Sequence, residues 1–261
     1  MRKFLLAACV AGLGIALSSA TAASASTSAP AWAPRTIVIG PHQSIQAAVN
    51  AARPGDTVLL LPGVYHQSVQ IRKDDITLRG SGAFRGGTVL VPPKKFPPTL
   101  CTQAFGNQLG IFVRHAHQVL VTDNLVSGNC QGILVLDDGQ PGGAGQVTIT
   151  YNRALTNNKF CPKSEETPAL QGGGILLLGA TRSLVAFNSV RGNSGKQINS
   201  GGIVVASAHA LTHGSNPNFD TIVRNVAFRN HPADLIWDGS GIGVRFRANV
   251  CGTSLPPGLC H

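Results

Sequence analysis

The sequence predicts an all-β solenoid of stacked strands, and its composition together with an internal repeat carries this prediction. Of the 261 residues, 43% are hydrophobic and only 12% are charged, so the chain can bury a substantial core. The chain has 31 glycines and one methionine, which argues against a helical bundle. No segment in the middle resembles a linker, so we expect one folded domain over residues 36–261.

The first 35 residues are expected to stand apart from that domain. Arg2 and Lys3 precede an apolar run from Phe4 to Leu17, which small residues with Ala-x-Ala sites follow. This pattern is typical of a secretory signal peptide at residues 1–25, and residues 26–35 are predicted to form a flexible leader. We therefore expect a secreted, extracellular protein. No later stretch is long and apolar enough to predict a membrane span.

A short helix is predicted at the start of the domain. Ser44 can cap a helix that Pro54-Gly55 ends. Its apolar face would consist of Ile45, Ala48, Val49 and Ala52. Such a helix would cover the open end of a stack of strands, whose outermost backbone groups otherwise lack partners.

The second half of the chain repeats a unit that is marked by asparagine. The aligned copies are VLVTDNLVSGN (119–129), VTITYNRALTN (147–157), SLVAFNSVRGN (183–193), DTIVRNVAFRN (220–230) and VRFRANVCGTS (244–254). The first column holds Asn124, Asn152, Asn188, Asn225 and Asn249, and the second holds Asn129, Asn157, Asn193 and Asn230. A second short strand follows four of the copies, as in GILVLDD from Gly132 and GILLLGA from Gly174, and GIFVRHA from Gly110 precedes the set.

Such short strands cannot bury their faces alone, so copies must stack on copies, as in a parallel β-helix. The asparagine side chains are then expected to stack from rung to rung and to satisfy backbone groups in the turns. Leucine-rich repeats also stack asparagines, but they need an LxxLxL strand and a return element of steadier length. The parallel β-helix is therefore favoured.

Four segments near the start of the domain match a common family opening. They are Ser-Ile-Gln-Ala-Ala from Ser44, Gly-Asp-Thr-Val from Gly55, Pro-Gly-Val-Tyr from Pro62 and Ile-Thr-Leu-Arg-Gly from Ile76. In these segments the chain resembles the pectate-lyase-like family of right-handed parallel β-helix proteins, and the resemblance covers nearly the whole mature chain. It implies that fold, but the family includes lyases, hydrolases, epimerases and non-catalytic proteins, so it implies no single reaction.

The strands that begin with Gly-Ile, together with the related strand at Asp234, supply the candidate site. Their alternation points one apolar set inward: Ile111, Ile133, Ile175, Ile203 and Leu235. It points a second apolar set outward: Phe112, Leu134, Leu176, Val204 and Ile236. An apolar outer face must be covered by loops, by another subunit or by a ligand. Longer loops flank this sheet, so we expect a trough in which Phe112, Leu134 and Leu176 contact a substrate.

A histidine and a carboxylate stand at the ends of two neighbouring strands of this set. His115 and Asp137 each come five residues after the glycine that begins the strand, and adjacent rungs lie roughly 4.8 Å apart. We expect this pair to form an oriented general base, with Arg114 as the third catalytic candidate. The residues expected to bind substrate around them are Asp138, Lys159, Lys163, His209 and His213. The competing interpretation is structural, since Asp137-Asp138-Gly139 is also an ordinary strand-ending turn and these histidines also suit solvated positions.

The reaction favoured for these residues is β-elimination on an acidic extracellular polysaccharide. A lyase needs a base, here His115, and positive charge beside the uronate carboxylate, from Arg114, Lys159 and Lys163 or from a bound calcium. No other cofactor is predicted. Hydrolysis is disfavoured because Asp238 lies three rungs from Asp137, about 14 Å away by the rung spacing, and a glycosidase pair needs roughly 5 to 9.5 Å.

Two other classes of function remain open. An apolar trough beside a His/Asp pair would also suit a small-molecule isomerase or cyclase, with a small apolar ligand as its partner. A non-catalytic module that binds cell walls or polysaccharides would suit the absence of the family's dense acidic calcium cluster. Removing Arg2 and Lys3 lowers the formal net charge from +10 to +8, and this basic surface favours anionic partners. The aromatic residues scarcely interleave with basic ones, so nucleic acid is not a predicted partner. The oligomeric state stays open.

The cysteines predict two disulfides in an oxidising compartment. Cys251 and Cys260 close a short loop at the C-terminus, and Cys130 and Cys161 each closely follow the second asparagine column, so each pair is expected to bond. Cys101 is then the odd thiol, because Cys9 leaves with the signal peptide. The HxxxH at His209 and His213 lacks the glutamate of HExxH, and no CxxC occurs, so no zinc site is predicted.

Overall fold

A computed structural model describes residues 33–83, 86–93, 109–164 and 167–260 of the chain. The predicted signal peptide, most of the leader and Cys101 lie outside the described residues. The residues from Ala33 onward form one compact unit. No helix in the described ranges is long and apolar enough to cross a membrane.

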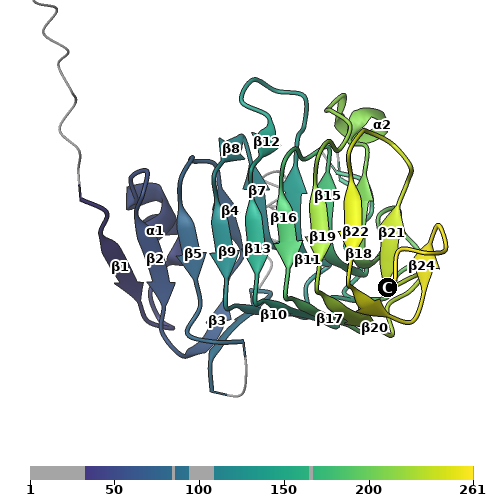
Figure 1. The fold of residues 1–261 in the computed structure, drawn as a ribbon. Coiled ribbons are helices and arrows are strands. Elements are labelled where there is room, and N and C mark those ends of the chain that lie inside the picture. The colour runs from purple at the N-terminus through teal and green to yellow at the C-terminus, as the bar shows by residue number, and fades with distance from the viewer. Residues whose placement is uncertain (1–32, 84–85, 94–108, 165–166, 261) are drawn as a thin grey trace, which may run out of the picture. The chain divides into compact units, whose positions relative to one another are not determined.

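Three parallel sheets build this unit, and they run side by side through its length (Figure 1). Sheet A consists, in spatial order, of β1 (Thr36–Ile39), β2 (Thr57–Leu60), β5 (Thr77–Arg79), β9 (Leu120–Thr122), β13 (Thr148–Thr150), β16 (Leu184–Ala186), β19 (Thr221–Val223) and β22 (Arg245–Arg247). Sheet B consists of β3 (Gly63–His66), β6 (Thr88–Val91), β10 (Leu125–Ser127), β14 (Arg153–Leu155), β17 (Ser189–Arg191), β20 (Val226–Phe228) and β23 (Val250–Cys251). Sheet C consists of β4 (Val69–Ile71), β7 (Leu109–Arg114), β11 (Gln131–Leu136), β15 (Gly173–Leu178), β18 (Gly201–Ala206), β21 (Leu235–Trp237) and β24 (Ser254–Leu255). A two-stranded sheet joins β8 (Ala116–His117) to β12 (Ala144–Gly145).

The chain visits the three sheets in turn, so each circuit makes one rung of a solenoid. One circuit runs through β9, β10 and β11, and β13 then pairs in parallel with β9, with Leu120 opposite Thr148. Sheet C lies in register in the same way, with Ile133 opposite both Ile111 and Ile175. The predicted parallel β-helix is therefore confirmed.

The core fills the space that the three sheets enclose. The predicted inward residues of sheet C are all fully buried in it: Ile111, Ile133, Ile175, Ile203 and Leu235. Burying apolar side chains of this size contributes about 1.5–3 kcal/mol each relative to leaving them exposed. Strand alternation thus fixes which side of each strand faces the core.

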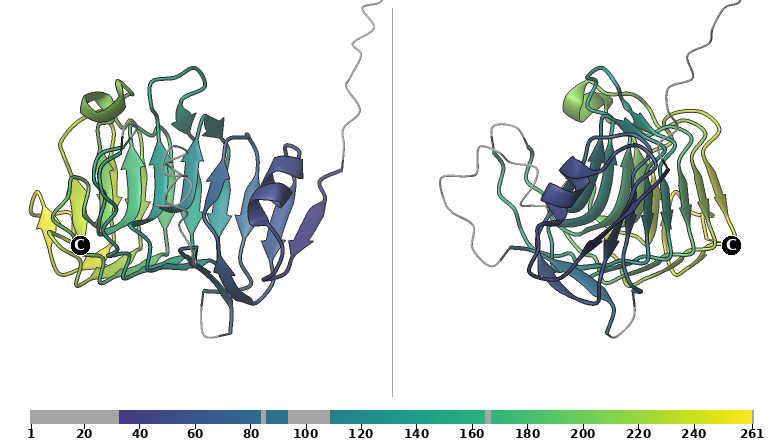
Figure 2. Two further views of the ribbon diagram at one scale, coloured as in Figure 1. Left: turned by 180° about the vertical axis from the view of Figure 1, so that it is seen from behind. Right: turned by 90° about the vertical axis from the view of Figure 1, so that its left-hand side faces the viewer.

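The predicted cap is the helix α1 (Ile45–Ala51), which lies across the end of the stack in the end-on view of Figure 2. The Ser44 hydroxyl accepts a hydrogen bond from the Ala47 N–H at 3.1 Å, as an N-cap residue does. The expected apolar face is buried: Ile45, Ala48, Val49 and Ala52. A second helix of one turn, α2 (His209–Thr212), follows β18.

Both asparagine columns form continuous ladders inside the turns. In the first column, the Oδ1 of Asn188 accepts hydrogen bonds from the backbone N–H and the side-chain amide of Asn152, at 2.9 and 3.2 Å. The second column repeats this pattern and ends on Asp234, whose carboxylate accepts from Asn230. The predicted structural role of the asparagines is confirmed.

The residue before each asparagine of the first column adopts a left-handed backbone conformation. These residues are Asp123, Tyr151, Phe187, Arg224 and Ala248, with φ between 50° and 61°. For residues other than glycine this conformation costs roughly 1–2 kcal/mol, and the ladder hydrogen bonds on the following residue offset that cost. The turns therefore hold one column of outward side chains, which we call the turn column.

Both predicted disulfides are formed. Cys130 bonds to Cys161 and joins the residue after Asn129, the first asparagine of the second column, to the segment before β15. Cys251 bonds to Cys260 and closes the C-terminal loop.

A buried carboxyl group lies at the corner that precedes β19. The Oδ1 of Asp220 accepts a hydrogen bond from the Ser183 N–H at 2.7 Å, whereas its Oδ2 has no hydrogen-bond partner in the described part of the chain. Burial raises the pKa of Asp220 to about 7, and the hydrogen bonds from Ser183 counter this only in part. The folded protein therefore holds a proton here up to nearly neutral pH.

Candidate active site

The predicted catalytic residues lie where β7 and β11 end. Arg114, the last residue of β7, is opposite Leu136, the last residue of β11. His115 follows with a left-handed φ of 50°, so its side chain leaves the alternation of the strand. β8 and β12 pair directly beyond this point. The strand ends thereby bring basic and acidic side chains to one edge of sheet C.

Four side chains meet at this edge, and we call them the His115 cluster: Arg72, Arg114, His115 and Asp138. The His115 Nε2 lies 2.7 Å from the Asp138 Oδ1. The Arg114 Nη1 lies 3.5 Å from the other carboxylate oxygen of Asp138. The Arg72 Nη2 lies 3.0 Å from the His115 Nδ1. The side chains of Arg114, His115 and Asp138 are only 12–17% exposed, so their charges interact more strongly than they would in bulk water.

The two partners of His115 determine where its proton lies. A guanidinium group only donates hydrogen bonds, so the Nδ1 that faces Arg72 must be the acceptor. The proton is then on Nε2 and is donated to Asp138. A carboxylate that fixes the tautomer of a histidine in this way leaves the opposite nitrogen as the basic atom.

Asp138 is suited to this role because it remains ionised. Burial alone would raise the pKa of Asp138, but the hydrogen bonds from His115 and Gln140 and the charge of Arg114 outweigh that effect and hold the pKa below its usual value. The cluster therefore presents a permanent carboxylate behind the imidazole and guanidinium groups around it.

The contact expected between His115 and Asp137 is not made, because Asp138 takes that place. Asp137 instead accepts hydrogen bonds from the Gly139 N–H at 2.9 Å and the Ser215 N–H at 3.2 Å. The register does bring Asp137 level with His115. The carboxylate of Asp137, however, turns into the strand-ending turn and toward the loop after α2, while His115 has left the strand direction. The expected strand-ending turn is thus present and anchors that loop.

The apolar outer face of sheet C is covered by the chain itself. Phe112, Leu134 and Leu176 are at most 4% exposed. They belong to a second apolar cluster with residues of the flanking loops, among them Cys161, Leu170 and Ala208. Loops, another subunit or a ligand could have covered this face, and the structure shows that the chain's own loops do. The predicted open trough is therefore not formed in the described part of the chain. These three side chains do not reach a ligand in this arrangement.

The described residues of this second cluster enclose a small cavity. Its volume is about 40 Å³, and its lining includes Leu134, Leu136, Leu178 and Leu211. The amide of Gln131 also lines it, and neither of its polar atoms has a hydrogen-bond partner in the described ranges. The space suits ordered water rather than a substrate, since ligand clefts measure about 300–1,000 Å³.

The remaining predicted binding residues lie on the loops beside sheet C. Lys159 and Lys163 are exposed on the segment between the second asparagine column and β15, and the Lys159 N–H donates to the Asn129 carbonyl. His209 is the first residue of α2, and His213 follows its last residue. Their rings meet edge to face, with centroids 6.5 Å apart. Within the described residues, no hydrogen bond or ion pair joins Lys163, His209 or His213 to the His115 cluster. Their contact with substrate stays a prediction.

Calcium does not fit the described donors. It takes six to eight oxygen ligands, and no three His, Cys, Asp or Glu side chains gather as a metal site within the described part of the chain. In the His115 cluster, Asp138 is the only carboxylate, and both of its oxygens already face His115 or Arg114. No step below is therefore assigned to a metal.

Arg72 was not among the predicted residues, although a signal for it exists. It follows β4, where Ile71 is opposite Val113 of β7, so Arg72 comes level with Arg114. Aligning the strand SVQIR of the opening segment with the Gly-Ile strands would have placed it beside the site.

Comparison with known proteins bears on the whole fold. Residues 65–218 match the family described as "Right handed beta helix region". Among solved structures, the chain is similar to the alginate lyase from Paenibacillus sp. str. FPU-7, at 15% identity over 84% of this chain and 75% of that one, with a TM-score of 0.50. It is also similar to a mannuronic acid specific polysaccharide family 6 lyase from human gut microbiota, at 14% identity over 78% of this chain and 67% of that one, with a TM-score of 0.34. A search of the curated proteins found no match.

At 15% identity, the likeness to the alginate lyase shows the fold alone. The family match, in contrast, extends over more than half of the chain and agrees with the stacked parallel sheets. The chain therefore belongs to the right-handed parallel β-helix family.

Proposed function

We propose that the chain is a carbohydrate-active protein that cleaves an acidic polysaccharide by β-elimination at the His115 cluster. The observation that carries this proposal is the position of His115, which a carboxylate holds on one side and a guanidinium group meets on the other. We further propose that it acts outside the cell. Its two disulfides support this, because such bonds persist in oxidising compartments.

In the proposed reaction the uronate carboxylate draws Arg72 away from His115 and pairs with it. The uncovered Nδ1 then takes the proton from the carbon beside that carboxylate. The electron pair left on the carbon forms a double bond as the bond to the glycosidic oxygen breaks, and the departing oxygen takes a proton from water. His115 then gives its proton to the hydroxide that remains, which restores the water and the neutral imidazole. The guanidinium groups of Arg72 and Arg114 stabilise the negative charge that develops at the carboxylate. Asp138 holds the imidazole in place and stabilises its charged form.

The alternative of a small-molecule isomerase or cyclase has less support. It needs an open apolar trough, whereas the second apolar cluster encloses a cavity of about 40 Å³ within the described residues. A non-catalytic polysaccharide-binding module remains the second candidate, and one observation favours it: Arg72 covers the basic atom of His115 in this structure.

The test follows the ultraviolet absorbance of unsaturated uronate ends when the mature protein is incubated with a panel of acidic polysaccharides. We expect an increase for the parent protein and a loss of about 10²- to 10⁴-fold in rate for His115→Ala, as for removal of a general base. The control is His66→Ala, because His66 is exposed on β3 of sheet B and lies outside the cluster. It should match the parent.

Two outcomes would contradict the proposal. If no polymer on the panel gives an increase with correctly folded parent, the protein is not a lyase of this kind. If His115→Ala keeps the parent's rate, the reaction does not use this site. A chelator should leave the rate unchanged. If a chelator lowers the rate and added calcium restores it, a metal rather than the arginines supplies the stabilising charge.

A further inference from the structure

The turn column carries a second group of side chains that the proposed reaction does not use. Because its members precede successive asparagines of one ladder, they recur at the rung spacing and lie one above another. Tyr151 and Phe187 are 56% and 42% exposed. Large exposed aromatic side chains on neighbouring rungs form an apolar patch that typically marks a binding surface.

The two rings are held in a fixed arrangement. Their planes differ by 6° and their centroids lie 5.2 Å apart. This separation exceeds the contact distance of roughly 3.5–4.0 Å between stacked carbon atoms, so the rings are offset and each leaves part of a face uncovered. The guanidinium group of Arg224 lies 5.7 Å from the centroid of Phe187.

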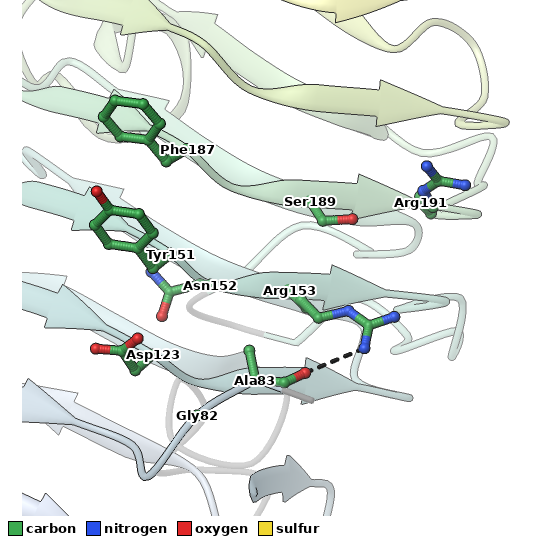
Figure 3. Close-up of a pocket in the computed structure, with 9 residues that line it drawn as sticks. All are labelled: Gly82, Ala83, Asp123, Tyr151, Asn152, Arg153, Phe187, Ser189 and Arg191. Carbon is green, nitrogen blue, oxygen red and sulfur yellow. Dashed lines mark hydrogen bonds between the residues drawn. The ribbon is translucent and has the colours of Figure 1, made fainter. Parts of the chain in front are cut away.

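Guanidinium groups stand on the other side of a hollow from these rings (Figure 3). The side chains of Arg153 and Arg191 project from β14 and β17, with Ser189 between them and the rings. Arg153 donates to the Ala83 carbonyl at 3.2 Å, and Arg191 packs over the ring of Phe228 at 5.6 Å. The hollow has a volume of about 390 Å³, within the range of ligand clefts.

We propose that this hollow, with Tyr151 and Phe187 on one side and Arg153 and Arg191 on the other, is a second binding site for an anionic saccharide chain. The apolar face of a sugar ring packs against the exposed aromatic faces, and its carboxylates pair with the two arginines. The site lies on sheet B and the turns before it, whereas the His115 cluster lies at the end of sheet C. It therefore holds the polymer without taking part in its cleavage.

The spacing of the rings and a hydrogen-bond acceptor beside them favour a saccharide over a nucleic acid here. Asp123 lies in the same column next to Tyr151, and its carboxylate, 3.6 Å from the Arg79 guanidinium group, can accept hydrogen bonds from sugar hydroxyls. Two rings that already contact each other also leave no gap for a base to stack between them.

The experiment measures the affinity of uronate oligosaccharides for the full mature chain by titration calorimetry. All proteins carry His115→Ala, so that no oligosaccharide is cleaved. We expect Tyr151→Ala to weaken binding about tenfold, and Arg153→Gln with Arg191→Gln to weaken it at least as much. The glutamine variants retain the packing of the side-chain stems, which keeps the test valid if Tyr151→Ala fails to fold.

The matched control is Phe219→Ala. Phe219 is 51% exposed, also has a left-handed φ, and lies 5.9 Å from an arginine, Arg182, but it belongs to a different turn. It should bind like the parent. Methyl-esterified oligosaccharides should bind the parent more weakly, because the arginines then lose their anionic partners.

Unchanged affinity in both the Tyr151 and the arginine variants would overturn the inference, as would tighter binding of single-stranded DNA than of uronate oligosaccharides. The inference shares only the class of ligand with the proposed function. Binding that depends on this hollow, without any cleavage by the parent, would leave the inference standing and end the lyase proposal. Cleavage by the parent, together with unchanged affinity in the Tyr151 and arginine variants, would support the lyase proposal and end this inference.

Discussion

Replacing Asn188 with alanine tests the asparagine ladder at its centre. The Oδ1 of Asn188 accepts from the backbone N–H and the side-chain amide of Asn152, and its own amide donates to the Ile149 carbonyl at 2.8 Å, the Ala186 carbonyl at 3.0 Å and the Asn225 Oδ1 at 3.0 Å. Asn188 is 1% exposed, so water does not replace these contacts.

The size of the effect follows from what alanine leaves behind. The backbone N–H of Asn152 loses its acceptor inside the protein, which costs about 1–3 kcal/mol. The Asn152 side chain keeps its hydrogen bonds to the Val121 and Thr150 carbonyls, so its loss is smaller. The lost donation by Asn188 adds roughly 1 kcal/mol or more. We expect the free energy of unfolding to fall by about 3 kcal/mol.

Urea unfolding followed by circular dichroism measures this loss, and Asn158→Ala is the matched control. Asn158 also accepts from one backbone N–H, at 2.6 Å, and donates to one carbonyl, at 2.8 Å, but it is exposed. We expect a loss within about 1 kcal/mol for this variant, because water takes over both contacts. Equal losses for the two variants would refute the claim that the buried ladder holds the turns.

Three further predictions concern stability. Asp220→Asn should gain roughly 3 kcal/mol of stability relative to the parent as the pH rises from about 4 to 7. Over this range the parent's unfolded chain releases the Asp220 proton while its folded chain still holds it, so the parent loses stability. A pH-independent difference in urea unfolding would contradict the raised pKa. Replacing Cys130 and Cys161 together with serine removes a link across 31 residues and should cost about 3–4 kcal/mol; an unchanged melting temperature would be inconsistent with that linkage. Gly214→Ala would place a methyl group 1.9 Å from the backbone oxygen of Asp137, so proteolysis of the loop after α2 should accelerate. The control is Gly40→Ala, whose methyl group would lie 3.6 Å from its nearest atom and should have no such effect. Equal cleavage of the two variants would show that the loop is not packed as described.

The parts of the fold that were predictable follow from periodic features of the sequence. The asparagine columns and the inward isoleucines recur from rung to rung, and stacking leaves them only one arrangement. Cys130 and Cys161 follow neighbouring asparagines of the second column, so the same stacking brings them together. Ser44 was predictable for a local reason, since an N-cap needs only its own turn.

The details of the site depend on local backbone geometry at strand ends and in loops, which the repeat pattern of the sequence does not determine. His115 pairs with Asp138 rather than with Asp137 because the chain has left the strand at both positions, and side-chain direction there depends on a left-handed φ and on a turn. The cover over Phe112 comes from loops without periodicity, so the alternation of the strand predicted an apolar outer face but not what lies on it. Tyr151 and Phe187 do share a column of the repeat, and reading the position before each asparagine would have found them.

The most direct test of the proposed elimination is the mass of the products formed from a defined uronate oligosaccharide. Elimination adds no water, so the account predicts two products whose masses sum to that of the substrate, one of them with an unsaturated end, and their loss in His115→Ala. Products whose masses sum to the substrate plus one water would show hydrolysis and contradict the account. An intact substrate after incubation with folded parent protein would contradict it as well.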